Sequence, residues 1–127
     1  MKGEFICVVC PNGCTIDAEF SAKPPSLISA EGYACDRGLS WIRQEIENPM
    51  RTIASSVLVR NGNFLAASVR TRTPIPLEKV RDVMEEIRGH RIDAPVRIGE
   101  VLIPDVAGTG VDIIATRDVE RVEPRAV

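Results

Sequence analysis

The segment 7-CVVCPNGCTIDAEF-20 holds three of the four cysteines of the chain and the start of a regular pattern. Pro11-Asn12-Gly13 is strong turn chemistry, because proline fixes φ while asparagine and glycine tolerate positive φ. After Cys14, residues 15–20 alternate polar and apolar side chains, the period-two pattern of a half-buried strand. The sequence therefore predicts a loop of thiols that leads directly into a strand.

Further short elements are expected on both sides of this loop. Residues 5–9 predict a short strand before it, and residues 27–30 predict a second strand after a break at Lys23-Pro24-Pro25. A hairpin of this kind returns the chain to Cys35 and would bring this fourth cysteine beside the other three. From residue 39 to 47 apolar side chains recur at helical intervals, which predicts a helix that closes a first module.

The rest of the chain predicts a second module. Asn61-Gly62 is typical of a β-hairpin turn, because both residues tolerate positive φ. The expected elements are a hairpin of residues 53–60 and 64–71, a helix ending at Gly89 with the apolar face Leu77, Val80, Val83, Met84 and Ile87, and strands at residues 96–103 and 111–116.

These patterns indicate an α+β fold. We expect a small cysteine-rich metal-binding module of short strands and a helix over residues 1–53. A compact β-hairpin, helix and β module is expected over residues 54–127 and is expected to pack with the first.

Composition narrows the class of protein. With 127 residues, 44% of them hydrophobic, the chain is large enough to bury a core without disulfide bonds. Its 16 Lys and Arg against 18 Asp and Glu argue against nucleic acid or an anionic membrane as the main partner. The first ten residues do not resemble a secretory signal, and no apolar run reaches the roughly 18 residues of a membrane span. We therefore expect a soluble, cytoplasmic protein, in which grouped cysteines are more often metal ligands or redox centres than disulfides.

The cysteine spacing is Cys7-x2-Cys10-x3-Cys14, then 20 residues, then Cys35. Four thiolates are a complete ligand set for one tetrahedral zinc ion and equally for a [4Fe-4S] cluster. Structural zinc sites usually combine two C-x2-C pairs, so the three-plus-one arrangement favours the cluster. Glycines beside the thiols, Gly13 and Gly38, would let backbone N–H groups approach sulfur.

Two other interpretations of the cysteines remain open. A zinc ion could serve only as a structural staple of an interaction module without redox activity. Alternatively, Cys7 and Cys10 could act as a thiol–disulfide pair in a metal-free protein. Four buried thiols acting merely as small apolar side chains fit poorly with three cysteines crowded around Pro-Asn-Gly.

The segments "CVVCPNGCTIDAEF" and "EGYACDRGLSWIRQEIENPMRT" resemble the N-terminal iron–sulfur segment of the molybdopterin oxidoreductases. The resemblance covers residues 5–53. It implies that the four cysteines ligate a [4Fe-4S] cluster, and that Arg37 occupies the place of a basic residue between cluster and pterin. The several hundred residues that hold the pterin in that family are absent here, so molybdenum chemistry is not implied.

Taken whole, the chain is similar to a family of small, largely uncharacterised bacterial and archaeal four-cysteine proteins, often called CxxC-motif proteins. Their C-terminal part resembles "VRIGEVLIPDVAGTGVDIIATRDV", residues 96–119. Members tend to be encoded beside FAD-dependent dehydrogenases of the anaerobic glycerol-3-phosphate dehydrogenase type. The resemblance implies a small electron-transfer or accessory subunit for such a flavoprotein.

The remaining candidate residues have simpler interpretations. Tyr33 and Trp41 flank Cys35 in sequence and are expected to shield the metal site. His90 is expected to meet the helix dipole, and Gly108-Thr109-Gly110 predicts a tight turn rather than a phosphate loop. The sequence contains no recognisable pairing of nucleophile and base and no dinucleotide-binding fingerprint, which favours a non-catalytic subunit over an enzyme.

Overall fold

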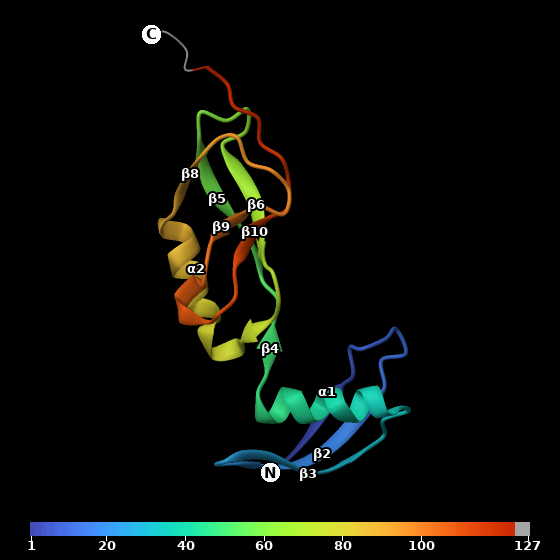
Figure 1. Cartoon of the computed structure of the whole chain (residues 1–127). Coiled ribbons are helices and arrows are strands. Elements are labelled where there is room, and N and C mark those ends of the chain that lie inside the picture. Colours follow the sequence, from blue (N-terminus) through green and yellow to red (C-terminus); the bar gives the residue numbers. More distant parts are fainter. Residues whose placement is uncertain (124–127) are drawn as a thin grey trace. The chain divides into compact units, whose positions relative to one another are not determined.

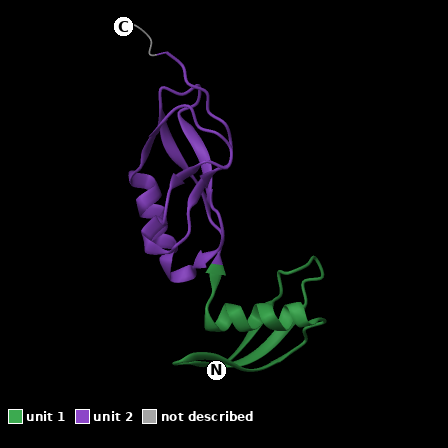
Figure 2. Cartoon of the chain, in the orientation of Figure 1, with its two compact units in different colours: residues 1–50 green, residues 51–127 purple. Residues whose placement is uncertain are grey.

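The computed structural model describes residues 1–123 of the chain (Figure 1). The chain divides into two units, residues 1–50 (unit 1) and residues from 51 onward (unit 2), which Figure 2 shows in different colours. The sequence predicts this boundary after residue 53, and the structure places it after residue 50. The expected packing of the two modules on each other stays a prediction.

Unit 1 is a three-stranded antiparallel sheet with one helix across it (Figure 1). The sheet has the order β1-β2-β3, so the strands follow one another as a meander. The helix contacts β2 and β3, and its buried residues include Ile42. The elements are β1 (Lys2–Ile6), β2 (Thr15–Ala22), β3 (Pro25–Glu31) and α1 (Asp36–Glu47).

Buried and exposed side chains alternate along β2, and this alternation decides which face of the sheet is covered. Ile16 and Ala18 are buried, whereas Asp17 and Glu19 between and after them are exposed. Since successive side chains of a strand point to opposite faces, one face of the sheet is apolar and the other is acidic. The apolar face forms a small core of buried Cys7, Ile16, Ala18 and Ile42, with Phe5, Phe20, Leu39, Trp41 and Ile46 among the partly buried side chains around it.

The first strand differs from the expected residues 5–9. It ends at Ile6, which pairs with Thr15, and the next contact is a hydrogen bond from the Cys7 N–H to the Cys14 carbonyl oxygen at 2.8 Å. This bond closes the thiol loop, so Val8 lies outside the ladder despite its high strand propensity, with 72% of it exposed. The strand predicted over residues 15–20 is confirmed and extends to Ala22, and the strand predicted over residues 27–30 is confirmed within Pro25–Glu31.

Unit 2 is a five-stranded sheet with α2 packed against it through Val83 and Ile87. Its order is β8-β5-β6-β10-β9, in which β5 and β8 run parallel and the other neighbours antiparallel. A separate pair of short strands, β4 and β7, lies outside this sheet. The elements are β4 (Met50–Arg51), which begins at the last residue of unit 1, and then β5 (Ala54–Arg60), β6 (Ala66–Thr71), β7 (Ile75–Pro76), a 3₁₀ turn (Leu77–Lys79), α2 (Val80–Gly89), β8 (Arg91–Asp93), β9 (Val101–Ile103), a 3₁₀ turn (Val106–Gly108) and β10 (Ile113–Ala115).

The predicted hairpin exists, but its turn is longer than Asn61-Gly62 implies. The last pair of the ladder is Leu58 with Ala66, and only Asn61 of the two turn residues has positive φ. Gly62 is needed for a different reason: a Cβ there would lie 2.7 Å from Cγ1 of Val119. The glycine therefore permits the close approach of a distant segment, which local turn statistics do not reveal.

Two further expectations for unit 2 are corrected. Leu77 does not share the buried face of α2, because it lies in the preceding 3₁₀ turn and is exposed. The strand expected at residues 96–103 is reduced to β9, and β8 was not expected at all. β8 forms because it pairs with the edge of β5 at Leu58, Val59 and Arg60. These paired residues are 33 positions apart in the chain, so local patterns could not predict the contact.

Within residues 1–123 the structure has two α-helices and ten strands in three sheets, which confirms the α+β fold class. Neither α-helix in this part of the chain combines the length and apolar character needed to cross a bilayer.

Candidate metal centre

The loop of residues 7–14 is held by the two strands that flank it. The hydrogen bond between Cys7 and Cys14 fixes both ends of the loop where β1 and β2 separate. Gly13 has φ of 61°, as its expected role in the turn requires. Cys7 and Cys14 thus lie at the base of the loop, and Cys10 lies between them along the chain.

β3 returns the chain to the thiol loop, so that Cys35, which follows β3, lies beside the other three cysteines. Gly32, directly after β3, has φ of 96°, and a Cβ there would collide with the carbonyl oxygen of Thr15. Only glycine therefore lets the chain pass this closely over the start of β2. Cys35 follows as the N-cap of α1, with extended backbone angles.

All four cysteines line one cavity of about 180 Å³, although they come from two separate segments. Cys7 is buried, Cys10 and Cys14 are half-buried and Cys35 is exposed. None of the four forms a disulfide. The cavity wall also contains two of the predicted cofactor-binding residues, Arg37 and Gly38, but not Gly13; its complete lining is Cys7, Val9, Cys10, Asn12, Cys14, Tyr33, Ala34, Cys35, Arg37 and Gly38.

Gly38 joins the two cysteine segments by close packing. It is buried in the first turn of α1, and a Cβ on it would lie 3.2 Å from Cβ of Tyr33 and 3.7 Å from Sγ of Cys7. The absence of a side chain avoids a tight contact with Tyr33, while Sγ of Cys7 lies within ordinary contact distance of the same position. The expected role of Gly38 beside sulfur thus has a steric component that sequence spacing does not show.

The N-terminus of α1 lowers the pKa of the Cys35 thiol. The backbone N–H groups of Gly38 and then of Arg37 lower this pKa most, desolvation opposes them, and the Arg37 guanidinium makes a smaller further contribution that lowers it. Helix N-termini stabilise thiolates because their free N–H groups and the helix dipole favour negative charge. A thiolate is the form that binds metal.

The two aromatic residues near Cys35 have different positions. Tyr33 lines the cysteine cavity, as expected for a shielding residue. Trp41 instead packs against the core of unit 1 and lines a neighbouring groove of about 390 Å³. Val9 and Arg37 belong to both hollows, so they form the wall between them.

The four cysteine thiols fit a metal group that is bound by thiolates. How far apart the four sulfurs lie distinguishes a zinc ion from a [4Fe-4S] cluster. A single zinc ion requires four sulfurs at about 2.3 Å from one point. Within residues 1–123, no three Cys, His, Asp or Glu side chains converge closely enough to hold one metal ion. A [4Fe-4S] cluster binds each thiolate to a different iron, so its ligand sulfurs are arranged around a larger body.

Residues that sequence patterning did not assign to the site are Val9, Asn12, Ala34 and Gly32. The first three lie within or beside the cysteine segments, so their adjacency in sequence was the available signal. Gly32 had none, because the need for it arises from Thr15 on a neighbouring strand.

The other candidates belong to unit 2, whereas all four cysteines belong to unit 1. His90 follows the last residue of α2, and its Nδ1 lies 2.8 Å from the carbonyl oxygen of Glu86. Gly108 and Gly110 have φ of 69° and 76°, so this segment is a tight turn, as expected. The Thr109 hydroxyl donates to the Val106 carbonyl oxygen at 2.7 Å, which stabilises it.

Comparison with known proteins places the chain in a family. Residues 36–117 match the family described as "Protein of unknown function (DUF1667)". The chain belongs to this family. The match begins at the first residue of α1, directly after Cys35, and ends after β10.

One solved structure resembles this member of the family. It is the NMR structure of a Clostridium perfringens protein, with 23% sequence identity and a TM-score of 0.53. The alignment covers 61% of this chain and 92% of that chain. At this identity the likeness concerns the fold alone. No curated protein matches the chain.

Proposed function

We propose that unit 1 binds a [4Fe-4S] cluster through Cys7, Cys10, Cys14 and Cys35, and that the chain is a non-catalytic electron-transfer or accessory subunit. The observation that supports this proposal is the single cavity lined by all four cysteines from two distant segments. Four thiolates match the four irons of such a cluster. When bound, the cluster supplies one-electron transfer.

Several groups around the cavity have roles in this proposal. The N–H groups of Gly38 and Arg37 lower the pKa of Cys35 and so favour the thiolate form that ligates metal, and the Arg37 guanidinium would offset part of the negative charge of four thiolates. Tyr33 and Val9 cover part of the cavity with apolar surface, which limits access of water. The exposed position of Cys35 leaves one side near the protein surface.

The partner proposed for this subunit is a flavin-dependent dehydrogenase of the glycerol-3-phosphate dehydrogenase type. This part of the proposal rests on the resemblance to CxxC-motif proteins alone. A flavin passes electrons singly as well as in pairs, so a one-electron carrier is a chemically reasonable acceptor for it.

The test is analysis of the full chain purified without oxygen. We expect broad visible absorption, about four irons and about four sulfides per chain, and no zinc. Replacing Cys35 or Cys10 by serine should remove most of the iron. The matched control is Ser40→Ala, which alters an exposed residue of the same helix outside the cavity and should leave the iron content unchanged. A colourless protein without iron under these conditions contradicts the proposal.

A second candidate is a zinc-stabilised interaction module without redox activity. The small core of unit 1 favours it, because only four residues of that cluster are buried and a unit of this size gains much from a bound metal. It predicts one zinc per chain, no colour, and unfolding of unit 1 on chelation. A metal-free protein with a reversible two-electron couple would instead indicate the thiol–disulfide alternative at Cys7 and Cys10.

A further inference from the structure

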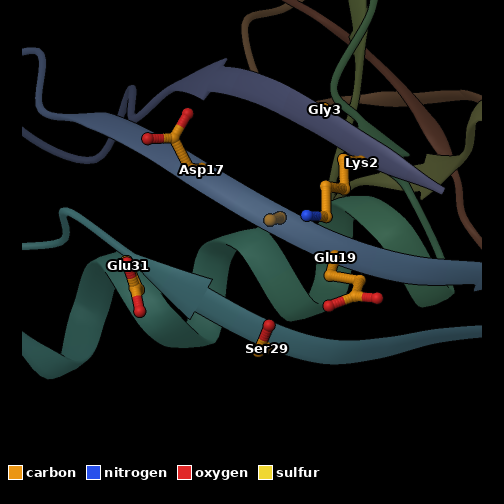
Figure 3. A pocket seen from close by; sticks show the side chains of 7 residues that line it. Lys2, Gly3, Asp17, Glu19, Ser29 and Glu31 are labelled. Carbon is orange, nitrogen blue, oxygen red and sulfur yellow. The ribbon is translucent and has the colours of Figure 1, made fainter.

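The sheet of unit 1 has a face that α1 does not cover, seen from close by in Figure 3. Its side chains are the exposed positions of the three strands, which alternate with the residues that face the core. Asp17 and Glu19 of β2 occupy its centre, and Glu31 of β3 and Lys2 of β1 lie on either side (Figure 3).

Carboxylates on this face lie directly opposite one another across the strands. Glu4 pairs in register with Asp17, and Asp17 pairs with Glu31, so one row crosses all three strands. The next row is Lys2, Glu19 and Ser29. Opposite positions of an antiparallel ladder share a face, and like charges there repel.

Nothing within the described part of the chain offsets this repulsion through a direct contact. No ion pair or hydrogen bond in residues 1–123 engages the side-chain carboxylates of Glu4, Asp17, Glu19 or Glu31. No three acidic side chains in that range converge on a point that could hold one metal ion. The carboxylates thus form a spread surface, which fits a partner with several cations better than a single bound ion.

A hollow of about 460 Å³ separates the two rows. Gly3 and Ala18 lie at its floor, because a Cβ on Gly3 would face Phe5 and Phe20 on the core side and the Ala18 side chain points to the core as well. The rows are roughly 7 Å apart, since each strand advances about 3.4 Å per residue. Alternate side chains of an extended polypeptide have the same spacing.

The acidic face also continues into an exposed apolar end. Ile6, two residues beyond Glu4 on the same strand, is 62% exposed and pairs with Thr15. It therefore extends the same face by one row toward the thiol loop. Carboxylates beside an exposed apolar side chain offer both charge and a place for a hydrophobic contact.

We propose that this open face, from Lys2, Glu4 and Ile6 across Asp17 and Glu19 to Glu31, docks an extended segment of a partner protein that bears lysine or arginine at alternate positions. Charge complementarity identifies the partner as basic, and the row spacing identifies its backbone as extended. The docking does not depend on which group the cysteines hold.

The probe is a fluorescein-labelled peptide of about eight residues in which lysine and threonine alternate, followed by one leucine. Fluorescence anisotropy measures its binding to the full chain at about 0.05 M and about 0.3 M salt. The test variant is Asp17→Asn with Glu31→Gln, which removes two charges at exposed sites and relieves repulsion. The control, Glu78→Gln with Glu85→Gln, makes the same charge change at exposed residues of unit 2.

We expect the test variant to bind the alternating peptide roughly fivefold more weakly at low salt, while the control changes affinity by less than about twofold. A peptide of the same composition with its lysines in one block should bind more weakly than the alternating one. Equal losses in both variants would show that net charge alone acts, and unchanged binding in the test variant would refute the docking face. Thermal stabilisation by Ca²⁺ or Mg²⁺ in the parent chain but not in the test variant would identify a cation site instead, and would also overturn the proposal.

Discussion

Replacing Gly38 by alanine tests how tightly α1 packs against the thiol loop. At an open position within a helix this change stabilises a protein by about 1 kcal/mol. Here the added methyl group would lie 3.2 Å from Cβ of Tyr33 and 3.7 Å from Sγ of Cys7. The Cβ of Tyr33 can move only with its backbone, so relief requires a shift of the chain, and overpacking of this kind costs about 1–3 kcal/mol. We therefore expect a net loss of about 0–2 kcal/mol in the free energy of unfolding of unit 1.

The single tryptophan makes this change measurable in unit 1 alone. Trp41 lies on α1 and packs against the core of that unit, so its fluorescence reports the unfolding of unit 1. With a urea dependence of about 1 kcal/mol per molar for so small a unit, the midpoint should fall by up to about 2 M. Both proteins are compared in the same metal state.

The control is Ser40→Ala, in the same helix. Ser40 is exposed, so its replacement changes only helix propensity and should leave the midpoint the same or raise it by up to about 0.5 M. If Gly38→Ala raises the urea midpoint by about 1 M, the full gain in helix propensity is observed and the added methyl group has no steric cost. That result would refute the close packing against Tyr33 and Cys7.

Two further outcomes are expected. In the metal-free, reduced chain, iodoacetamide should alkylate Cys35 before the other thiols at neutral pH, because the lowered pKa leaves more thiolate and the side chain is exposed. The rate should fall as the pH drops through that pKa, and Arg37→Gln should slow it; equal labelling of all four thiols in peptide mass spectra would contradict this. Gly62→Ala should destabilise unit 2 by about 1–3 kcal/mol, since its methyl group would lie 2.7 Å from Cγ1 of Val119. Gly89→Ala, with nothing within 4 Å of the added methyl group, should be neutral or slightly stabilising in thermal unfolding followed by circular dichroism.

Local patterns predicted the elements whose residues interact within one element or with the next. The strand after Cys14 and the helix that ends near Asn48 were both visible in the periodicity of their apolar residues. The hairpin around Asn61 was also predicted, although its turn is longer than expected. Such elements bury one face, and burial imposes a period on the sequence.

Elements that depend on distant partners were missed or misplaced. β8 pairs in parallel with β5, and the three residues Arg91–Asp93 contain no pattern that predicts this pairing. The first strand ends at Ile6 because a backbone hydrogen bond closes the loop at Cys7, although Val8 and Val9 have strong strand propensity.

The cysteine site also has features that the sequence predicts and features that only the tertiary structure shows. The sequence by itself determined which chemistry is available, because four thiols in a three-plus-one spacing limit the ligand set to thiolates. Only the tertiary structure decided that Cys35 lies in one cavity with the others, and it did so through Gly32 and Gly38. Gly32 is required by the carbonyl oxygen of Thr15 on another strand, whereas an added Cβ at Gly38 would be tight against Cβ of Tyr33 and would also touch Sγ of Cys7. Residue identity is local information, whereas steric contact between segments depends on the register of the whole sheet, so spacing could suggest the site but could not assemble it.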